Sequence, residues 1–526
     1  MKPKKKRTKE EILIDRLKLY ESLLQEKGVD VKALTESYKA SRSHGGHDTG
    51  GLVFREPSDC LEDSSDYESG ADRVDEDEDD FVLGLTPRLS GHRPRHPPVN
   101  QVLELWQIFR ENVDPLVKLV HVPTLQTAIQ EAACNLEKTP RSLEALLFAI
   151  YSMAVKSLED LDCEQRFCES RQVLLSRYIK ATKVTLSRAN LMGTSNLVVL
   201  QAFLFYILSI REVYNSRTLW TLTGVATRIA KGMGLHRDGT FLGLPPFETE
   251  IRRRIWSEIS MLEFGIADLS GSDKFGNTDT DTKGPKRAVS VNDDELYPGM
   301  PSPPVESEKV TGMVLCAMRS EIGSYWTSYR VRQRQLGKAA DIWDKYGSVE
   351  DMQEIEKAIN KLERILESKY VCTLDPSQPV QLIAMLFARS AVGKVRFIVH
   401  HPRRWASVER IPDSERRYVW DLCIKLLEQC NMARSSSQLR RFSWYLGPYF
   451  QWQAFIHILD AIRATPLMPE AAKAWRLIEE VYENFPDLAR NIKEPVHLIS
   501  PRFVGSSKQQ ALTERNEKEG AKAQMG

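Results

Sequence analysis

The chain has 526 residues, of which 42% are hydrophobic, and its formal net charge of +1 favours neither a strongly acidic nor a strongly basic partner. The charge is segregated, because residues 2–9 carry six basic groups and no acid, whereas residues 75–80 are six consecutive acids. The eight cysteines form no Cys-x-x-Cys pair. We therefore interpret them as reduced, mostly buried thiols of an intracellular protein.

Residues 1–27 are predicted to be a basic linker followed by one short amphipathic helix. The basic run could contact phosphates or act as a nuclear import signal, or it could be a solvated tail; its candidate residues are Lys4, Lys5, Lys6 and Arg7. The helix carries apolar residues at 4-3-4 spacing, which suits a dimerising coil; these are Leu13, Leu17, Tyr20 and Leu24. Two heptads are few for a coiled coil, so a single helix docked on the rest of the protein is the alternative.

Residues 28–98 are rich in Gly, Ser, Asp, Glu and Pro, and we predict a disordered acidic linker there. The acids at 75–80 are followed by Phe81, Val82 and Leu83. This composition is that of acidic activation segments, although a solvated linker is the plainer interpretation. His92 and His96 are expected to be solvated loop residues rather than metal ligands.

Residues 99–492 show helical periodicity without alternating strand patterns, so the fold class is predicted to be all-α, with a polar C-terminal tail at 493–526. The first helix is expected to bury Leu103, Trp106, Phe109 and Val113. The most apolar run, 197–210, is 14 residues long and is followed by Arg211 and Glu212. Because a membrane span needs about 20 apolar residues, we interpret it as a buried core helix.

The stretch from Trp220 to Ile259 predicts two helices joined by a turn. Gly234 is expected to end the first helix in the left-handed conformation, and Pro245 and Pro246 are expected to precede the second. Arg252–Arg254 are expected to form a solvated face paired with Glu248 and Glu250 at i,i+4 spacing. His236 is interpreted as a turn histidine rather than as a catalytic or sensing group. Small residues on the first helix suit the close approach of a neighbouring helix.

Taken in order, these pieces resemble the middle homology region of fungal zinc binuclear-cluster transcription factors. The first piece is a Gly-x-Ala-x-x-x-Ala helix (Gly224, Ala226, Ala230), and the second is a Gly-Leu-His-Arg-Asp turn (Gly234, His236, Arg237, Asp238). An arginine-rich helix follows with Arg253 and Trp256, and then an acidic loop with Asn292 and Asp293. The resemblance covers roughly residues 99–490 and implies an all-α fungal regulatory domain.

That family binds two zinc ions through six cysteines placed before a basic linker and a dimerising coil. The cluster is absent from this chain, so we expect no cofactor and no metal ligand in it, with zinc present only if a missing N-terminal cluster exists. The resemblance implies a nuclear transcription regulator of a metabolic or secondary-metabolite gene set. The alternative is a cluster-less helical scaffold or effector-binding co-regulator that does not itself bind DNA.

The partners implied are DNA if the full-length protein carries the cluster, a second copy of the chain, the transcription machinery and a small-molecule effector, but no membrane. An enzyme is not expected, because the sequence shows no Gly-rich phosphate loop, no His-Glu-x-x-His and no nucleophile elbow.

Overall fold

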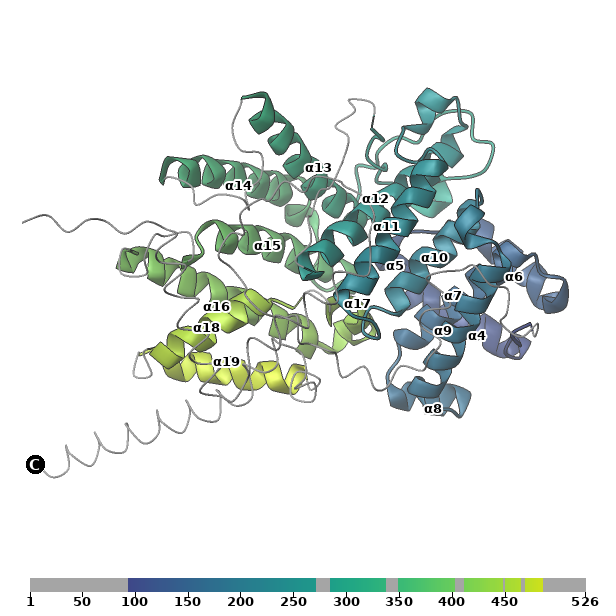
Figure 1. Cartoon of the computed structure of the whole chain (residues 1–526), viewed down its shortest axis with the longest axis horizontal. Helices are drawn as coiled ribbons and strands as arrows, with labels where there is room; N and C mark the ends of the chain where they lie inside the picture. Colours follow the sequence, from purple (N-terminus) through teal and green to yellow (C-terminus); the bar gives the residue numbers. More distant parts are fainter. Residues whose placement is uncertain are drawn as a thin grey trace, which may run out of the picture. The chain divides into compact units, whose positions relative to one another are not determined.

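The structure, a computed structural model, describes residues 93–270, 284–336, 349–402, 411–447, 450–464 and 469–485 (Figure 1). Within these ranges every regular element is a helix and no strand occurs, which confirms the predicted all-α class. None of the described helices is both long enough and apolar enough to cross a membrane. The basic linker, the predicted dimerising helix and the acidic run at 75–80 lie outside the described residues. The predicted domain boundaries stay predictions.

The first part of the helical body runs from residue 99 to residue 270. Its α-helices are α4 (Val99–Asn112), α5 (Asp114–Val117), α6 (Val122–Cys134), α7 (Arg141–Lys156), α8 (Asp160–Phe167), α9 (Arg171–Arg188), α10 (Leu197–Ser209), α11 (Ser216–Gly232) and α12 (Pro246–Ser270). Short 3-10 helices lie between them at η1 (Leu136–Lys138), η2 (Leu191–Gly193) and η3 (Gly239–Leu242).

An irregular segment with one 3-10 turn, η4 (Asp293–Glu295), leads to the second part of the body. The α-helices there are α13 (Val314–Gln335), α14 (Val349–Lys369), α15 (Pro379–Val399), α16 (Asp413–Ser435), α17 (Ser443–Leu446), α18 (Trp452–Ala464) and α19 (Ala471–Asn484). Two further 3-10 helices are η5 (Val371–Thr373) and η8 (Ser437–Phe442).

Helices α7 and α10 form the centre of the larger hydrophobic core, and they pack against each other (Figure 1). Both are apolar on nearly every side, and a helix of this kind is stable only when neighbours surround it. In α10 the residues from Val199 to Ser209 are all buried. The 197–210 run is therefore a core helix, as predicted. At their C-terminal ends, Lys156 Nζ donates a hydrogen bond of 3.0 Å to the carbonyl oxygen of Ser209.

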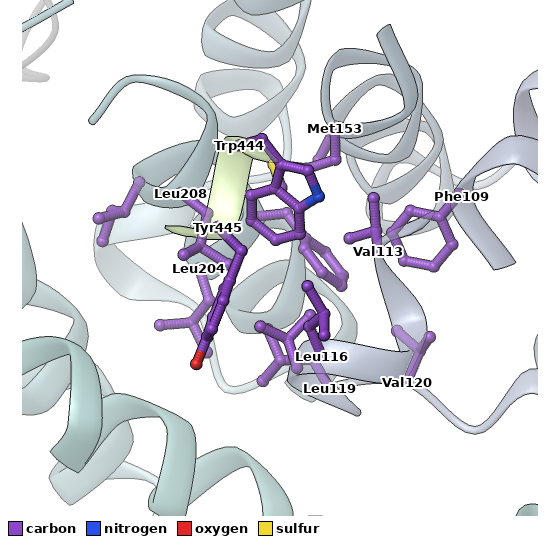
Figure 2. Close-up of a cluster of buried hydrophobic side chains, with 14 of the residues drawn as sticks. Phe109, Val113, Leu116, Leu119, Val120, Met153, Leu204, Leu208, Trp444 and Tyr445 are labelled. Carbon is purple, nitrogen blue, oxygen red and sulfur yellow. The ribbon is translucent and has the colours of Figure 1, made fainter. Parts of the chain in front are cut away.

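A second hydrophobic cluster is formed by the end of α15 together with α16, α18 and α19. The short helix α17 does not belong to it. Trp444 and Tyr445 instead enter the larger core, where they lie among side chains of α4, α5, α7 and α10 (Figure 2). The indole nitrogen of Trp444 donates a hydrogen bond of 3.0 Å to the carbonyl oxygen of Asn112. We call these two aromatic residues and their surroundings the aromatic junction.

Some predictions of burial were wrong. Leu103 is 42% exposed, because the stripe that α4 turns toward the core passes through Val102 instead, one position earlier. Cys134, Cys168 and Cys372 are exposed, so the described cysteines are not mostly buried, although all of those described are free thiols.

His96 is not a solvated loop residue, and its immediate neighbours in the chain are ordered against the body. Its side chain is only 7% exposed, and its ring stacks on Phe148 with centroids 4.5 Å apart. Nearby, Arg93 donates to the buried carboxylate of Glu144 and to the carbonyl oxygens of Leu136 and Glu137. The chain is therefore held against α7 several residues before α4 begins.

Candidate functional site

The turn after α11 has the geometry that its glycine predicts. Gly234 has φ +79°, and its N–H donates to the carbonyl oxygen of Lys231. The N–H of Leu235 donates to the carbonyl oxygen of Ala230, and the Leu235 side chain is 1% exposed. These two hydrogen bonds and the apolar contact make up a Schellman ending, which requires a left-handed residue where glycine has no steric penalty. The chain therefore leaves α11 in a fixed direction.

That direction brings Asp238 into the protein interior, where it is 0% exposed. Its two carboxylate oxygens accept hydrogen bonds of 2.9 Å each from Nε and Nη2 of Arg253 on α12. They also accept from the backbone N–H and hydroxyl of Thr240 and from the backbone N–H of Lys286, at 3.2, 2.6 and 2.8 Å. One carboxylate thus joins the turn, α12 and the segment after residue 283.

Arg254, the next residue on α12, makes a second set of contacts with this segment. Its Nη1 lies 2.6 Å from Oδ1 of Asp293, and its Nη2 lies 3.5 Å from the carbonyl oxygen of Val291. Glu250 accepts a hydrogen bond of 2.8 Å from the N–H of Val289. We call Asp238, Glu250, Arg253, Arg254 and Asp293 the ionic junction.

The arginine-rich helix was predicted to present a solvated face, and this prediction was wrong. Arg253 and Arg254 are 8% and 3% exposed. The expected pair between Arg252 and Glu248 exists, with 3.0 Å between Nε and Oε1. The remaining two arginines turn inward because their main partners come from residues 15 and 39 positions away. A pattern of local i,i+4 pairs cannot reveal such partners.

The 3-10 turn η4 fixes the acidic loop that carries Asn292 and Asp293. The side chain of Asn292 accepts a hydrogen bond of 2.9 Å from the N–H of Gly312, and its backbone N–H donates to Glu295. The carbonyl oxygen of Asp293 lies 2.8 Å from Nε2 of His121. The loop is therefore held at both α6 and α12.

Burial and hydrogen bonding act against each other on these carboxyl groups. Burial alone would raise the pKa of Asp238, but the hydrogen bonds from Arg253, Thr240 and Lys286 outweigh it and hold the pKa well below its usual range. Burial also opposes ionisation of Asp293, whose pKa is lowered by Lys118 and Arg254. Glu250 differs, because burial dominates and raises its pKa.

Other residues singled out from the sequence lie around the ionic junction. Ala226 and Ala230 are buried at the contact of α11 with its neighbours, with exposed fractions of 1% and 0%. Gly224 does not support a close approach, since a Cβ atom added there would have no neighbour within 4 Å. The rings of His236 and Trp256 have centroids 6.4 Å apart, and Arg237 is exposed. Lys4–Arg7 and the four residues of the predicted dimerising helix lie outside the described residues.

Several contributors to this region, His121 among them, were missed by the sequence reasoning. Lys118 lies 2.6 Å from Oδ2 of Asp114 and 3.5 Å from Oδ2 of Asp293. Arg319 of α13 lies 2.9 Å from Oε2 of Glu258 on α12, and both side chains are at most 5% exposed. The one signal in the sequence that could have indicated these buried charges was that charged residues interrupt otherwise apolar helical stripes. Such interruptions do not identify a partner far away in the sequence.

The arrangement links the turn after α11, α12 and the loop at Asp293. Its charges are paired, and the small hollow beside it is lined in part by Lys118, Arg254, Glu258 and Arg319. In the part of the chain that the structure describes, no group of three or more His, Cys, Asp or Glu side chains could hold a metal ion. The described cysteines therefore do not fit a zinc cluster.

Comparison with known proteins identifies this helical body. A family described as "Fungal specific transcription factor domain" matches residues 106–267, which run from α4 to the second half of α12 and include Asp238 and Arg253. Residues 106–267 therefore form a fungal transcription factor domain, as the resemblance in the sequence indicated.

Individual relatives agree with this assignment. The chain is 35% identical over 408 residues to the aurofusarin cluster transcription factor aurR2 of Gibberella zeae, covering 77% of this chain and 59% of that protein. It is 29% identical over 452 residues to the pyriculol/pyriculariol biosynthesis cluster transcription factor 1 of Pyricularia oryzae, covering 84% and 58%. It is 27% identical over 400 residues to the C6 finger domain transcription factor hasF of Aspergillus fumigatus, covering 68% and 51%. The chain thus spans somewhat more than half the length of these relatives.

Proposed function

We propose that this chain is the regulatory part of a nuclear transcription regulator that controls a fungal secondary-metabolite gene set, and that it is not an enzyme. The observation that carries the proposal is the domain match over residues 106–267. It is supported by relatives described as regulators of aurofusarin and pyriculol/pyriculariol clusters. The buried ionic junction supports a body that maintains one geometry rather than one that transforms a substrate.

In this proposal the residues before the body carry the contacts with nucleic acid and with a second copy. Lys4–Arg7 would contact phosphates or direct import, and Leu13, Leu17, Tyr20 and Leu24 would dimerise. Zinc would belong to a cysteine cluster of the kind named in the C6 finger relatives. The transcription machinery and a small-molecule effector are the remaining proposed partners.

The proposal is tested by deleting the gene and measuring transcripts genome-wide. The expected result is a fall of at least severalfold in the transcripts of one contiguous gene set, restored by complementation. Complementation with an Asp238→Ala variant should fail even when its nuclear level is matched to wild type. An unchanged transcriptome, or scattered changes that complementation does not reverse, would contradict the proposal.

The second candidate is a co-regulator that works through a partner protein instead of reading DNA itself. Cys60 is the single cysteine among residues 1–133 of this chain, so this stretch does not by itself hold six zinc ligands. Purified chain can be titrated with duplex DNA at low and at physiological salt. Weak, salt-sensitive and sequence-independent binding fits four phosphate contacts without base readout and supports the co-regulator. Specific binding at physiological salt would contradict it.

Self-association separates the roles of the proposed coil and the body. Sedimentation velocity of the full chain and of a variant with Leu13→Asp and Leu17→Asp should show a dimer for the first and a monomer for the second. A dimer in both would place self-association in the helical body.

A further inference from the structure

Helix α11 has a solvent-exposed face with an unusual composition. Its exposed side chains recur at a spacing that confines them to an arc of about 100° on a helix, and the opposite face packs on α10 and α12. Arg217, Trp220, Thr221, Arg228 and Lys231 form this face, which we call the α11 face. It extends over about 21 Å at 1.5 Å per residue.

The α11 face is basic and carries one large aromatic ring. The helix has no acidic residue along its length. Within the described ranges neither Arg217 nor Arg228 has an ion-pair partner, and Glu263 of α12 is the carboxylate beside Lys231. Trp220 is 42% exposed. Exposed tryptophan among arginines is typical of surfaces that bind other molecules, because the ring contributes a large apolar contact at small entropic cost.

We propose that the α11 face binds the chain's own acidic segment, residues 75–83. The six acids from Asp75 to Asp80 complement the three cations, and Phe81, Val82 and Leu83 supply apolar side chains for Trp220. Nine extended residues span about 30 Å, enough to follow a face of about 21 Å. This contact is independent of the proposed role in transcription, and it shields the acidic segment from other basic partners.

The chain can reach the α11 face from the point where it joins the body. Arg93 is anchored on Glu144 near the start of α7. Helices α7 and α10 end together at Lys156 and Ser209, and α11 then begins at Ser216 after a short connection. Because α10 lies between α7 and α11, the axes of these two helices are two interhelical spacings of 8–10 Å apart, about 20 Å in all. The residues between 83 and 93 span up to about 35 Å when extended.

Photo-crosslinking in the full chain tests the proposal. A photoreactive p-benzoylphenylalanine replaces Trp220, and the crosslinked peptides are identified by mass spectrometry. The expected crosslink joins position 220 to residues 75–85 of the same chain. Its yield should fall at least about fivefold in an Arg217→Glu, Arg228→Glu, Lys231→Glu variant, because attraction becomes repulsion. Added salt should lower the yield as well.

A control with the same change in charge reverses three exposed cations of α14, with Lys357→Glu, Lys361→Glu and Arg364→Glu. This variant should leave the crosslink unchanged. Mixing isotope-labelled and unlabelled chains separates contacts within one chain from contacts between two copies, and the latter would overturn the proposal. The proposal would also be overturned if position 220 formed no crosslink to residues 75–85, or if the crosslink yield fell equally in both variants. Preferential crosslinking to added duplex DNA would overturn it too, and would identify a nucleic-acid surface.

Discussion

Two junctions hold distant segments of this chain together, and they do so by different physics. The ionic junction joins the turn after α11, α12 and the loop at Asp293 through charged hydrogen bonds of fixed direction. The aromatic junction places Trp444 and Tyr445 in a core formed by helices more than 200 residues earlier (Figure 2). Buried ion pairs contribute little net stability but restrict geometry, whereas buried aromatic area contributes mainly free energy.

The two junctions should also differ in their response to acid. The pKa of Asp238 and that of Asp293 are lowered in the folded protein, so their contribution to stability is present above the unfolded value of 3.8 and is lost as the pH falls below it. The Trp444 indole and the Asn112 carbonyl do not titrate in this range. The ionic junction is therefore the acid-sensitive one of the two.

The largest expected effect is that of Trp444→Ala. Removing the indole leaves a cavity among core side chains and takes away the donor to the Asn112 carbonyl oxygen. We expect a loss of about 3–5 kcal/mol for the cavity and about 1 kcal/mol for the hydrogen bond. Urea unfolding followed by circular dichroism measures this loss. Trp220→Ala serves as the control, because replacing an exposed residue should change stability by no more than about 0.5 kcal/mol. Equal losses for the two variants would contradict the burial of Trp444 in the aromatic junction.

The next largest effect is expected for Asp238→Ala. This change should lower the free energy of unfolding by about 3–5 kcal/mol, because it leaves the Arg253 guanidinium buried without its main partner. The same unfolding measurement applies. A double-mutant cycle with Arg253→Met sharpens the result, since the double variant should recover about 1–3 kcal/mol relative to additivity. Strict additivity of the two changes would mean that the ion pair itself does not couple these residues.

Two glycines, one inside α11 and one in the turn that follows it, should give effects of opposite sign. Gly234→Ala forces a residue with a Cβ atom to keep φ at +79° and should destabilise the protein by about 1–2 kcal/mol. Gly224→Ala meets no atom within 4 Å and lies inside the helix, so it should stabilise by up to about 1 kcal/mol. Thermal melting of both variants measures the difference, and a shift in the same direction for both would be inconsistent with this geometry.

The smallest effect concerns His400, which lies outside both junctions. Its ring nitrogens lie 2.5 Å from Glu415 and 3.4 Å from Glu356, with Arg396 and Tyr418 also close. Burial would lower the pKa of His400, but the two carboxylates raise it above 6.5. Its stabilisation is therefore present below pH 6.5 and lost as the pH rises through the folded value.

The variant His400→Gln should accordingly lose stability at pH 5.5, by up to about 1 kcal/mol, and lose less at pH 8.5. Urea midpoints at the two pH values measure the change. A destabilisation that does not vary with pH would show that the ring acts through packing alone.

The elements that the sequence predicted well are those governed by neighbours along the chain. The buried run 197–210 and the glycine ending of α11 follow from composition and local backbone preference. Burial within α4 was predicted one position out, at Leu103 instead of Val102, because the pattern of apolar residues there permits both stripes.

The candidate site was predicted only in part. The motif positions that converge on it were identified, but Arg253 and Arg254 were assigned to solvent. They were assigned to solvent because, in the sequence, pairing with Glu248 and Glu250 on the same helix already accounted for an arginine-rich stretch. Lys118, Arg319 and Glu258 were not singled out at all, because nothing in a single sequence links them to partners 61 to 175 positions away.

The sequence by itself determined the all-α class, the glycine ending of α11 and the resemblance to the family, since these depend on interactions within about four residues and on an ordered set of motifs. Tertiary structure alone decided which charged faces turn inward and which short helix enters which core. A buried ion pair or a docked tryptophan needs both partners to be brought together and shielded from water. Asp238 acquires its role only beside Arg253, and Trp444 only within the core to which α4, α7 and α10 contribute.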